Sequence, residues 1–451
     1  MFRKILIANR GEIAARIIRT CRKMGIETVA VYSEADQMAP YVQQADESYL
    51  IGPPRVSESY LNASRILEIA KITHADAIHP GYGFLSENEK FAEECAAEGV
   101  IFIGPSSSIL NQMGNKIAAR KAMKAAGLPI IPGTDDAVDT VKEALSAARG
   151  IGYPIMLKAT AGGGGIGMEV VHTDEELIRA FESNSKRALS FFGDGSMFIE
   201  KKIENARHIE IQVMADQHGQ AVHLYDRECS IQRRNQKVVE EAPSIFITEK
   251  TRKLMGEAAV DAIKQLGYTN AGTLEFLVDS QENFYFLEMN TRIQVEHPIT
   301  EEITGIDIVE EQIKIAGGMK LAIRQEDVHV DGHAIEVRIY AEDPITFFPS
   351  PGHISTFELP VGQFIRNETA VVADYDVTPF YDPMISKLIV KGNDRDAAIR
   401  LLKQALSEYK IEGIRTNIPM LLKIVEHEQF IAGNTTTSFV DQFYLQQNKE
   451  N

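Results

Sequence analysis

Cysteine is scarce in this chain, with only Cys21, Cys95 and Cys229 among 451 residues. Their odd number and wide spacing exclude a disulfide framework and the close ligand spacing of a zinc site, and they favour a reducing compartment. No apolar run approaches the ~18 residues that a membrane span requires. The start Met1-Phe-Arg-Lys4 leads into an apolar segment too short for a signal peptide, so we expect a cytoplasmic protein without membrane contact.

Basic residues are also in deficit. Lysine and arginine total 47 against 64 aspartate and glutamate residues, which gives a formal net charge of −17. This charge argues against nucleic acid as a partner, although it leaves room for local basic pockets. The hydrophobic fraction of 44% and the charged fraction of 25% are ordinary for a soluble globular protein. A chain of this length should form about two to four domains.

Residues 1–110 alternate short apolar strands with amphipathic helices. We expect strands at 4–8, 27–32, 75–79 and 100–103, and helices at 11–24, 61–71 and 88–97. This alternation predicts a parallel, doubly wound sheet with helices on both faces. The first turn, Ala8-Asn-Arg-Gly-Glu-Ile13, lacks the G-x-G-x-x-G pattern and argues against nicotinamide binding. The segment His79-Pro-Gly-Tyr-Gly-Phe-Leu-Ser86 is either a ligand loop or a plain turn.

A second unit begins with a helix predicted at 116–126, followed by a strand at 153–158 that ends in Lys158. Four glycines at 162–165 come next, between apolar strands, and their bare backbone can cover phosphates. No Gly-Lys-Ser/Thr follows them, so this is not a Walker A loop. The strand predicted at 197–203 alternates polar and apolar residues, as one wall of an adenine slot would. A third unit from 332 is strand-rich to about 390 and ends in helices at 395–409 and 417–425.

A predicted hairpin contains the most informative residues. Strands at 272–279 and 284–290 flank a turn, and pairing of Asp279 with Phe284 places Glu275 opposite Glu288. Opposed side chains have Cβ atoms about 4.5–5.5 Å apart, so the two carboxylates repel unless a cation lies between them. Mg²⁺ suits this pair, because it takes hard oxygen ligands and bridges carboxylates to phosphates. The alternative is a solvated polar face on an amphipathic hairpin.

Polar residues continue in the same alternation beyond the hairpin. If the chain stays extended, Asn290, Arg292, Gln294 and Glu296 share the face of Glu288, since side chains alternate along a strand. This row would combine a metal ligand, an anion-binding guanidinium and a candidate base. The opposite side is apolar, with Leu287, Met289, Ile293 and Val295.

These segments, in this order, resemble the biotin carboxylases of the ATP-grasp superfamily. The resemblance covers nearly the entire chain, and the string Glu288-Met-Asn-Thr-Arg-Ile-Gln-Val-Glu-His297 is highly specific within that superfamily. Asn235 departs from the pattern, because the family commonly has a histidine or an aromatic residue there. Other matching segments are 8–13, 79–87, 103–105, Lys158 with its glycine loop, 207–212, 227–234, 236–243 and Tyr381-Asp-Pro-Met-Ile-Ser-Lys387.

The resemblance implies an α/β and α+β architecture in three parts. These are an N-terminal doubly wound, Rossmann-like domain at 1–114, an ATP-grasp domain at 115–330 with a mobile lid at about 130–203, and a C-terminal mixed α+β domain at 331–446. The implied reaction makes N-carboxybiotin from ATP, bicarbonate and biotin through carboxyphosphate. Closure of the lid would exclude water from that hydrolysable intermediate.

The resemblance also implies roles for individual residues at the nucleotide. ATP would bind with one or two Mg²⁺ or Mn²⁺ ions, held by Glu275, Glu288 and Asn290. Glu200, Lys201 and Ile203 would face the adenine. The ribose and phosphates would contact His208, Gln232 and Gln236, together with Lys116, Lys158, Lys237 and the loop glycines Gly163, Gly164 and Gly165.

Four residues would carry the chemistry, namely Arg292, Glu296, Arg338 and Lys237. Arg292 would hold bicarbonate with its planar guanidinium, assisted by Gln294 and Val295, and Glu296 would take the bicarbonate proton. Arg338 would stabilise the biotin enolate, and the alternative is an ordinary ion pair with Glu336 on the same strand. Tyr82 and Gly83 would lie near the biotin ring, and Arg16, Arg19, Phe364 and Arg366 match a region used for homodimer contacts.

Biotin itself is expected on a separate protein. Ala122-Met-Lys-Ala125 lacks the second methionine of a biotin attachment motif, and the chain ends without room for a carrier or a carboxyltransferase. The partners would be a biotin carboxyl carrier protein and carboxyltransferase subunits, as in acetyl-CoA carboxylase, which makes malonyl-CoA for fatty acid synthesis. Alternatives are a subunit or domain of another acyl-CoA or pyruvate carboxylase, a different ATP-grasp ligase, or a non-catalytic nucleotide-binding regulator.

Overall fold

A parallel five-stranded sheet forms the N-terminal part of the computed structural model, which describes residues 1–160 and 167–445. The strand order is β3-β2-β1-β4-β5. Ile5 and Ile7 pack with helix α1 on one face, while Leu6 and Ala8 pack with α3 and α4 on the other, so the sheet is doubly wound as predicted. The bounds are β1 Lys4–Ile7, α1 Gly11–Lys23, β2 Glu27–Ser33, α2 Pro40–Gln44, β3 Glu47–Gly52, α3 Ala63–Ile72, β4 Ala77–His79, α4 Glu89–Ala97 and β5 Ile101–Phe102.

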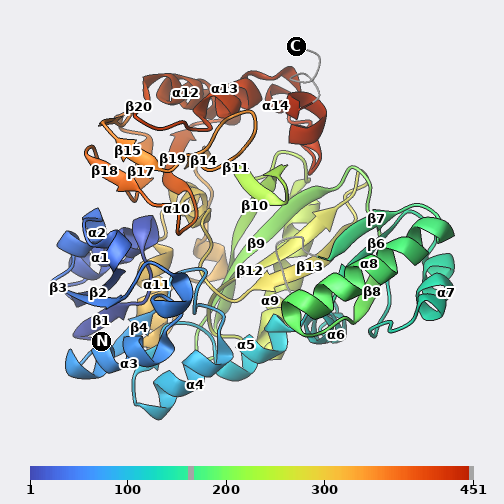
Figure 1. Cartoon of the computed structure of the whole chain (residues 1–451), viewed down its shortest axis with the longest axis horizontal. Helices are drawn as coiled ribbons and strands as arrows, with labels where there is room; N and C mark the ends of the chain where they lie inside the picture. Colours follow the sequence, from blue (N-terminus) through green and yellow to red (C-terminus); the bar gives the residue numbers. More distant parts are fainter. Residues whose placement is uncertain (161–166, 446–451) are drawn as a thin grey trace.

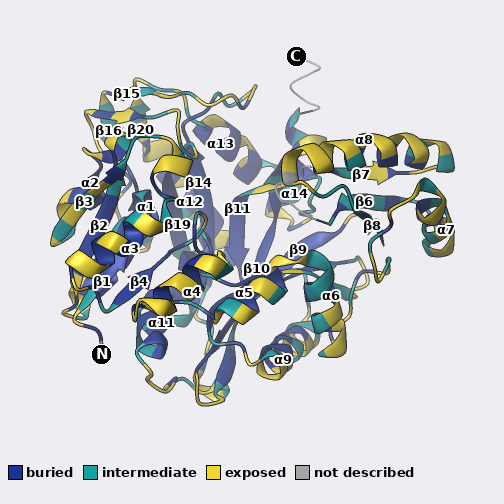
Figure 2. Cartoon of the chain, turned by 60° about the horizontal axis from the view of Figure 1, so that its bottom comes forward, coloured by how far each residue is buried: buried dark blue, intermediate teal, exposed yellow. Residues whose placement is uncertain are grey.

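A small antiparallel sheet, ordered β7-β6-β8, projects to the side of the molecule with helices α7 and α8 (Figure 1). It has its own apolar core, which includes Leu157, Leu177 and Ile199. Helix α8 is exposed along much of its length (Figure 2). The bounds of this segment and of the helices before it are α5 Ser107–Gly114, α6 Lys116–Ala125, α7 Val141–Ile151, β6 Ile155–Ala159, β7 Met168–Val171, α8 Asp174–Phe192 and β8 Met197–Lys201.

An eight-stranded antiparallel sheet forms the centre, in the order β13-β12-β9-β10-β11-β14-β19-β17. Strand β14 pairs with β11, so strands from the predicted third unit extend the sheet of the second. The sheet is buried beneath flanking helices (Figure 2). The bounds are β9 Arg207–Ala215, β10 Ala221–Arg233, β11 Gln236–Ala242, α9 Glu249–Leu266, β12 Asn270–Val278, β13 Phe284–Asn290, α10 His297–Thr304, α11 Ile308–Ala316, β14 His333–Tyr340, β17 Ile365–Thr369 and β19 Met384–Gly392.

The C-terminal part covers one end of this sheet. Helices α12 and α13 pack against it through one apolar core that also includes residues of α1 and β1. Two short antiparallel pairs, β15 with β18 and β16 with β20, complete the segment. No helix among the described residues is long and apolar enough to span a membrane. The remaining bounds are β15 Gly352–Ile354, β16 Thr356–Glu358, β18 Tyr375–Val377, α12 Arg395–Glu408, β20 Lys410–Glu412, α13 Ile418–Glu426 and α14 Glu428–Ile431.

Candidate active site

The β12–β13 hairpin places Glu275 directly opposite Glu288, as the sequence predicts. The register is reached differently, because Val278 rather than Asp279 pairs with Phe284. A β-bulge next to Glu275 adds one residue on the β13 side and restores the predicted alignment of the two carboxylates. The hairpin therefore carries two acidic side chains on one face at the edge of the central sheet.

Glu275 is buried and fully engaged. Its carboxylate accepts hydrogen bonds from Lys237 Nζ, Asn290 Nδ2 and Gln294 Nε2, each at 2.8 Å, and lies 3.0 Å from His208 Nε2. Burial alone would raise the pKa of Glu275, but the charges of Lys237 and His208 outweigh it and hold that pKa well below its ordinary value. Glu275 is therefore an anion with its negative charge already balanced.

Glu288 is the opposite case. Its side chain is open to a cavity, and no side chain in residues 1–160 or 167–445 donates a hydrogen bond to it. The cavity walls desolvate the carboxylate and the charge of Glu275 repels it, so the pKa of Glu288 is raised, while Lys116 offsets this only in part. Lys116 begins helix α6, where the helix dipole disfavours a cation, and desolvation lowers its pKa. This end of the site is short of positive charge.

Lys237 joins three carboxylates at the centre of the site. Its Nζ lies 2.6 Å from Glu210, 2.8 Å from Glu275 and 2.6 Å from Glu296. Burial lowers the pKa of Lys237, but the three surrounding carboxylates raise it well above its ordinary value. Arg227, which is fully buried, supports the same cluster by donating from Nε to Glu210 at 2.5 Å. The ammonium is therefore charged, and three carboxylates hold it in place before a ligand binds.

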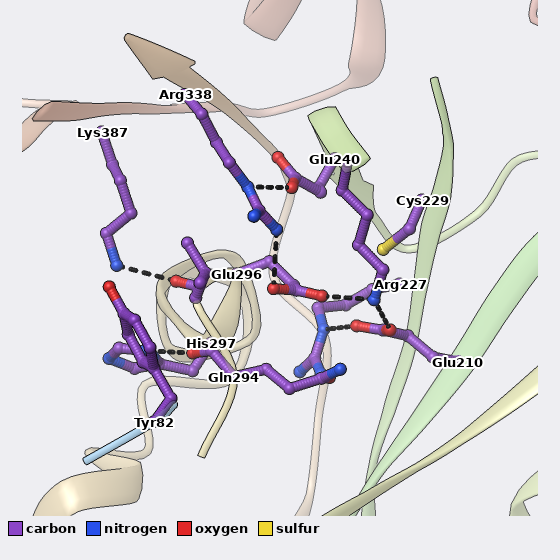
Figure 3. A network of polar contacts seen from close by, with 12 residues as sticks. Tyr82, Glu210, Arg227, Cys229, Glu240, Gln294, Glu296, His297, Arg338 and Lys387 are labelled. Carbon is purple, nitrogen blue, oxygen red and sulfur yellow. Dashed lines mark hydrogen bonds and ion pairs between the residues drawn. The ribbon is translucent and has the colours of Figure 1, made fainter. Parts of the chain in front are cut away.

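Arg338 reaches the same cluster from β14 (Figure 3). Its Nε donates to Glu240 at 2.6 Å and one terminal nitrogen donates to Glu296 at 3.0 Å. The alternative pairing with Glu336 is wrong, because neither oxygen of Glu336 has a hydrogen-bond partner among the described residues. Burial raises the pKa of Glu296, but Lys237 and Arg338 outweigh it and hold that pKa far below the ordinary value.

The prediction that the chain stays extended beyond Asn290 is wrong. Strand β13 ends at Asn290, residues 291–296 form an irregular turn, and helix α10 begins at His297. The turn still directs these side chains to one place. Arg292 donates to Asn290 Oδ1 at 2.8 Å and to Glu87 at 3.0 Å, which fixes its guanidinium at the mouth of the site.

Two adjoining cavities gather the predicted residues. The first, of about 470 Å³, is lined by every described residue predicted for ATP, metal and catalysis, including Gln232 and Ile203. The second, of about 450 Å³, is lined by Tyr82 and Gly83. The two cavities share a wall made of Arg292, Val295, Arg338, Tyr340 and Asp382. The predicted glycines Gly163, Gly164 and Gly165 lie outside the described residues.

The first cavity has a cationic and an apolar side. Glu200 is buried between Lys158 and Arg120, at 2.5 Å from each, so its carboxylate anchors Lys158 rather than facing the cavity as an anion. Lys201 also lines the cavity, but its Nζ donates to the Gly152 and Tyr153 carbonyl oxygens at 2.9 and 3.0 Å, so its ammonium is already engaged by the protein. The apolar side, lined by Ile131, Met156, Phe198, Leu277 and Leu287, can accept a flat ring.

The backbone conformation of the turn at residues 234–235 favours asparagine at position 235. Arg234 and Asn235 form the two-residue turn between β10 and β11, and both have positive φ, of 51° and 63°. Hairpin turns with two positive φ values favour asparagine, because its short side chain tolerates the left-handed region. Asn235 also lines the first cavity.

Comparison with known families assigns the chain. Residues 1–110 match the profile of the biotin carboxylase N-terminal domain, residues 115–324 that of the carbamoyl-phosphate synthase L chain ATP binding domain, and residues 336–442 that of the biotin carboxylase C-terminal domain. Biotin carboxylase 2 of Bacillus subtilis is 60% identical over 442 residues, which is 98% of this chain and 100% of that protein. The chain belongs to the biotin carboxylase family.

Relatives and solved structures extend this result. A pyruvate carboxylase subunit from Methanothermobacter thermautotrophicus is 55% identical, with 98% of this chain and 90% of that protein covered. A Campylobacter jejuni biotin carboxylase complex with β-γ-ATP has a TM-score of 0.96 at 49% identity, covering 98% and 99% of the two chains. The Hydrogenobacter thermophilus 2-oxoglutarate carboxylase biotin carboxylase domain dimer, in complex with MgADP, ADP and bicarbonate, has a TM-score of 0.95 at 48% identity, covering 98% of both. The predicted fold class is confirmed.

The residues of this biotin carboxylase fit a divalent cation at the hairpin. Glu288 has no hydrogen-bond donor in the described part of the chain, and desolvation together with repulsion from Glu275 raises its pKa, so a cation bound at Glu288 would stabilise its ionised form. Both carboxylates offer the hard oxygen ligands that Mg²⁺ prefers. Asn290 is less free, because Oδ1 already accepts from Arg292 and Nδ2 donates to Glu275.

Several residues of this biotin carboxylase site were missed from sequence. Glu210 and Arg227 lie in segments that match the family, but other charged and polar residues stand beside them in β9 and β10, so residue type alone did not distinguish them. Glu87 directly follows the predicted ligand loop, which ends at Ser86. The contacts of Glu240 and Arg120 were not predicted, because their partners, Arg338 and Glu200, come from distant parts of the chain.

Proposed function

We propose that this biotin carboxylase uses ATP and bicarbonate to carboxylate biotin attached to a separate carrier protein, through carboxyphosphate. The observation that carries this is the shared wall between two cavities. One contains the hairpin carboxylates, Lys116, Lys158 and an apolar slot, which suit Mg-ATP. The other opens on the far side of Arg338 beside Tyr82, which suits biotin.

The order of events follows from which contacts an incoming ligand can replace. A divalent cation at Glu275 and Glu288, when bound, supplies positive charge that offsets the β and γ phosphates. Lys237 and Arg292 both line this cavity, and they would neutralise the phosphates and orient bicarbonate respectively. Their pairing with Glu296 and Glu87 keeps both in place before the ligands arrive.

Glu296 is the proposed base for the bicarbonate proton. With Lys237 and Arg338 attached, its depressed pKa makes it a weak base. When Lys237 turns toward phosphate, Glu296 loses the larger of the two charges that hold its pKa down and becomes a stronger base, while Arg338 turns toward biotin only after carboxyphosphate has formed. Bicarbonate then attacks the γ-phosphoryl group and ADP leaves. Carboxyphosphate breaks down to CO₂ and phosphate, phosphate accepts the biotin N–H proton, and the biotin nitrogen attacks CO₂ to give N-carboxybiotin.

The first candidate for a parent complex is acetyl-CoA carboxylase, with biotin carboxyl carrier protein and carboxyltransferase subunits as partners and a cytoplasmic location. Support comes from the match to the full length of a Bacillus subtilis protein named biotin carboxylase. A pyruvate carboxylase is the second candidate, because the pyruvate carboxylase subunit of Methanothermobacter thermautotrophicus is 55% identical over 444 residues.

We also propose a homodimer, in which Arg16, Arg19, Phe364 and Arg366 contact the partner.

The test is ADP release by the purified protein with Mg-ATP, omitting bicarbonate and free biotin in turn. We expect a rate that requires bicarbonate and rises strongly with biotin. A biotin-independent rate would indicate a different ATP-grasp ligase. ATP binding without turnover, with a carrier protein supplied, would indicate a non-catalytic regulator.

A further inference from the structure

We propose that Glu240 is a positioning residue for Arg338, and that Glu336 opposite it stays protonated so that the two carboxyls carry a single negative charge. The inference deepens the proposed function, on which it rests, by naming the pair that prepares Arg338 for biotin. Neither carboxyl is used by the mechanism above.

The geometry places the two carboxyls together. Strands β11 and β14 are antiparallel, and Glu240 is directly opposite Glu336 in their register. Directly opposed residues have Cβ atoms about 4.5–5.5 Å apart on the same face of the sheet. Arg338 follows Glu336 by two residues on β14 and therefore shares that face. Glu240 and Glu336 are each 0% exposed.

Three carboxyl oxygens of this pair have no hydrogen-bond donor among the described residues. They are Oε2 of Glu240 and both oxygens of Glu336, while Oε1 of Glu240 accepts from Arg338. Two buried carboxylates this close cannot both ionise cheaply, because like charges repel and burial disfavours each charge. One proton on the pair supplies one of the missing donors and removes one of the two charges.

The surroundings decide which carboxyl keeps the proton. Glu240 touches the Arg338 guanidinium at 2.6 Å, which favours its ionised form, whereas Glu336 has no such contact within residues 1–160 and 167–445. Burial raises the pKa of Glu336 well above its ordinary value, and raises that of Glu240 to about 7. The charged groups that face the pair are Arg338 on β14, Lys237 on β11, Lys387 on β19 and Glu296 before α10.

For catalysis, the pair determines how the Arg338 guanidinium is oriented. Glu240 accepts from Nε of Arg338, and one terminal nitrogen of Arg338 donates to Glu296 (Figure 3). Arg338 lines both cavities, so its guanidinium is held at the boundary between them. A second negative charge at Glu336 would compete for the same guanidinium and pull it back along the strand. The protonated Glu336 keeps Arg338 available to the biotin side.

The first test separates two activities in Glu240→Gln. We expect kcat/KM for biotin to fall about ten- to a hundredfold, because a charge-assisted contact to Arg338 is lost. Bicarbonate-dependent ADP release without biotin should fall much less. Equal losses in both activities would overturn the positioning role, and a wild-type protein without biotin dependence would instead contradict the proposed function.

Glu241→Gln is the matched control. Glu241 is the next residue of β11, is also buried, and also pairs with an arginine, Arg395, at 2.6 Å. Its side chain faces the opposite side of the sheet. We expect lower thermal stability without a selective loss of biotin turnover, and a selective loss in this control would count against the role of Glu240.

The second test detects the proton directly. The infrared difference between wild type and Glu336→Gln at neutral pH should contain the carbonyl band of a protonated, buried carboxylic acid. Absence of that band would overturn the neutral Glu336.

Since the pKa of Glu240 is raised to about 7, kcat/KM for biotin should also rise as the pH passes through that value, and the step should vanish in Glu240→Gln.

Discussion

At the centre of the site three carboxylates surround the ammonium of Lys237, whereas at the hairpin edge Glu288 faces Glu275 with no donor from the described residues. The central cluster is already neutralised by the protein, and a ligand that binds there must exchange contacts. The hairpin edge lacks such a partner and would gain stability from the cation that we propose binds there. The difference indicates which part of the site binds metal and which part responds to substrate.

Removing the cation of the central cluster should have the largest effect. Lys237→Met leaves Glu210, Glu275 and Glu296 buried without their shared partner, and breaking a buried ion pair in this way costs about 3–5 kcal/mol. We expect a clear drop in thermal unfolding temperature, measured by calorimetry, together with loss of ADP release. An unchanged unfolding temperature would contradict the view that Lys237 holds this cluster together.

The hairpin edge should behave in the opposite way. Glu288→Gln removes a like-charge repulsion, so the unfolding temperature should stay the same or rise. Turnover should fall by roughly a thousandfold, about 4 kcal/mol, because a metal-binding anion is lost. ADP release as a function of Mg²⁺ concentration measures this, and a substantially active Glu288→Gln protein would refute the metal assignment.

A paired carboxylate outside the site provides a reference. Burial raises the pKa of Glu241, but His333 and Arg395 outweigh it and lower it from 4.5 to about 2. This contribution of about 3 kcal/mol is therefore present above pH ~4.5 and lost as pH falls toward 2. Denaturant unfolding across this range should show a smaller loss of stability in Glu241→Gln than in wild type. If the stability of both proteins fell equally with pH, the assigned contribution of Glu241 would be contradicted.

The smallest effect expected is a difference between two activities of one variant. Arg338→Gln should reduce biotin carboxylation about tenfold more than bicarbonate-dependent ATP cleavage, because Arg338 acts after carboxyphosphate forms. Both rates are measured on the same preparation, so misfolding cannot produce the difference. Equal losses would remove Arg338 from the biotin step.

The sequence predicted the doubly wound sheet because strand and helix periods are local. It missed strand β3, Glu47–Gly52, which lies at the sheet edge with most of its residues partly or fully exposed, and therefore lacks a continuous apolar run. It also aligned Glu275 with Glu288 correctly despite a wrong starting pair. The β-bulge next to Glu275 offsets the error in the starting pair. The alternation of polar and apolar residues did not predict that bulge.

Most predicted site residues converge in the structure, but their contacts were not predictable. Residues 291–296 reach the site through a turn rather than along a strand, and the Glu240 contact to Arg338 joins β11 to β14, which are distant in sequence. Pairings of this kind depend on the three-dimensional packing of strands, whereas pattern and propensity describe single segments.

The most direct test of the difference between the two regions is Mn²⁺ affinity in the presence of ADP, measured by electron paramagnetic resonance of free Mn²⁺. Wild type is compared with Glu288→Gln at the hairpin edge and Arg338→Gln in the central cluster. We predict that Glu288→Gln weakens Mn²⁺ binding at least about tenfold, the loss of one charged ligand, and that Arg338→Gln leaves it nearly unchanged. Unchanged binding in Glu288→Gln, or equal weakening in both variants, would contradict the assignment of the metal to the hairpin edge.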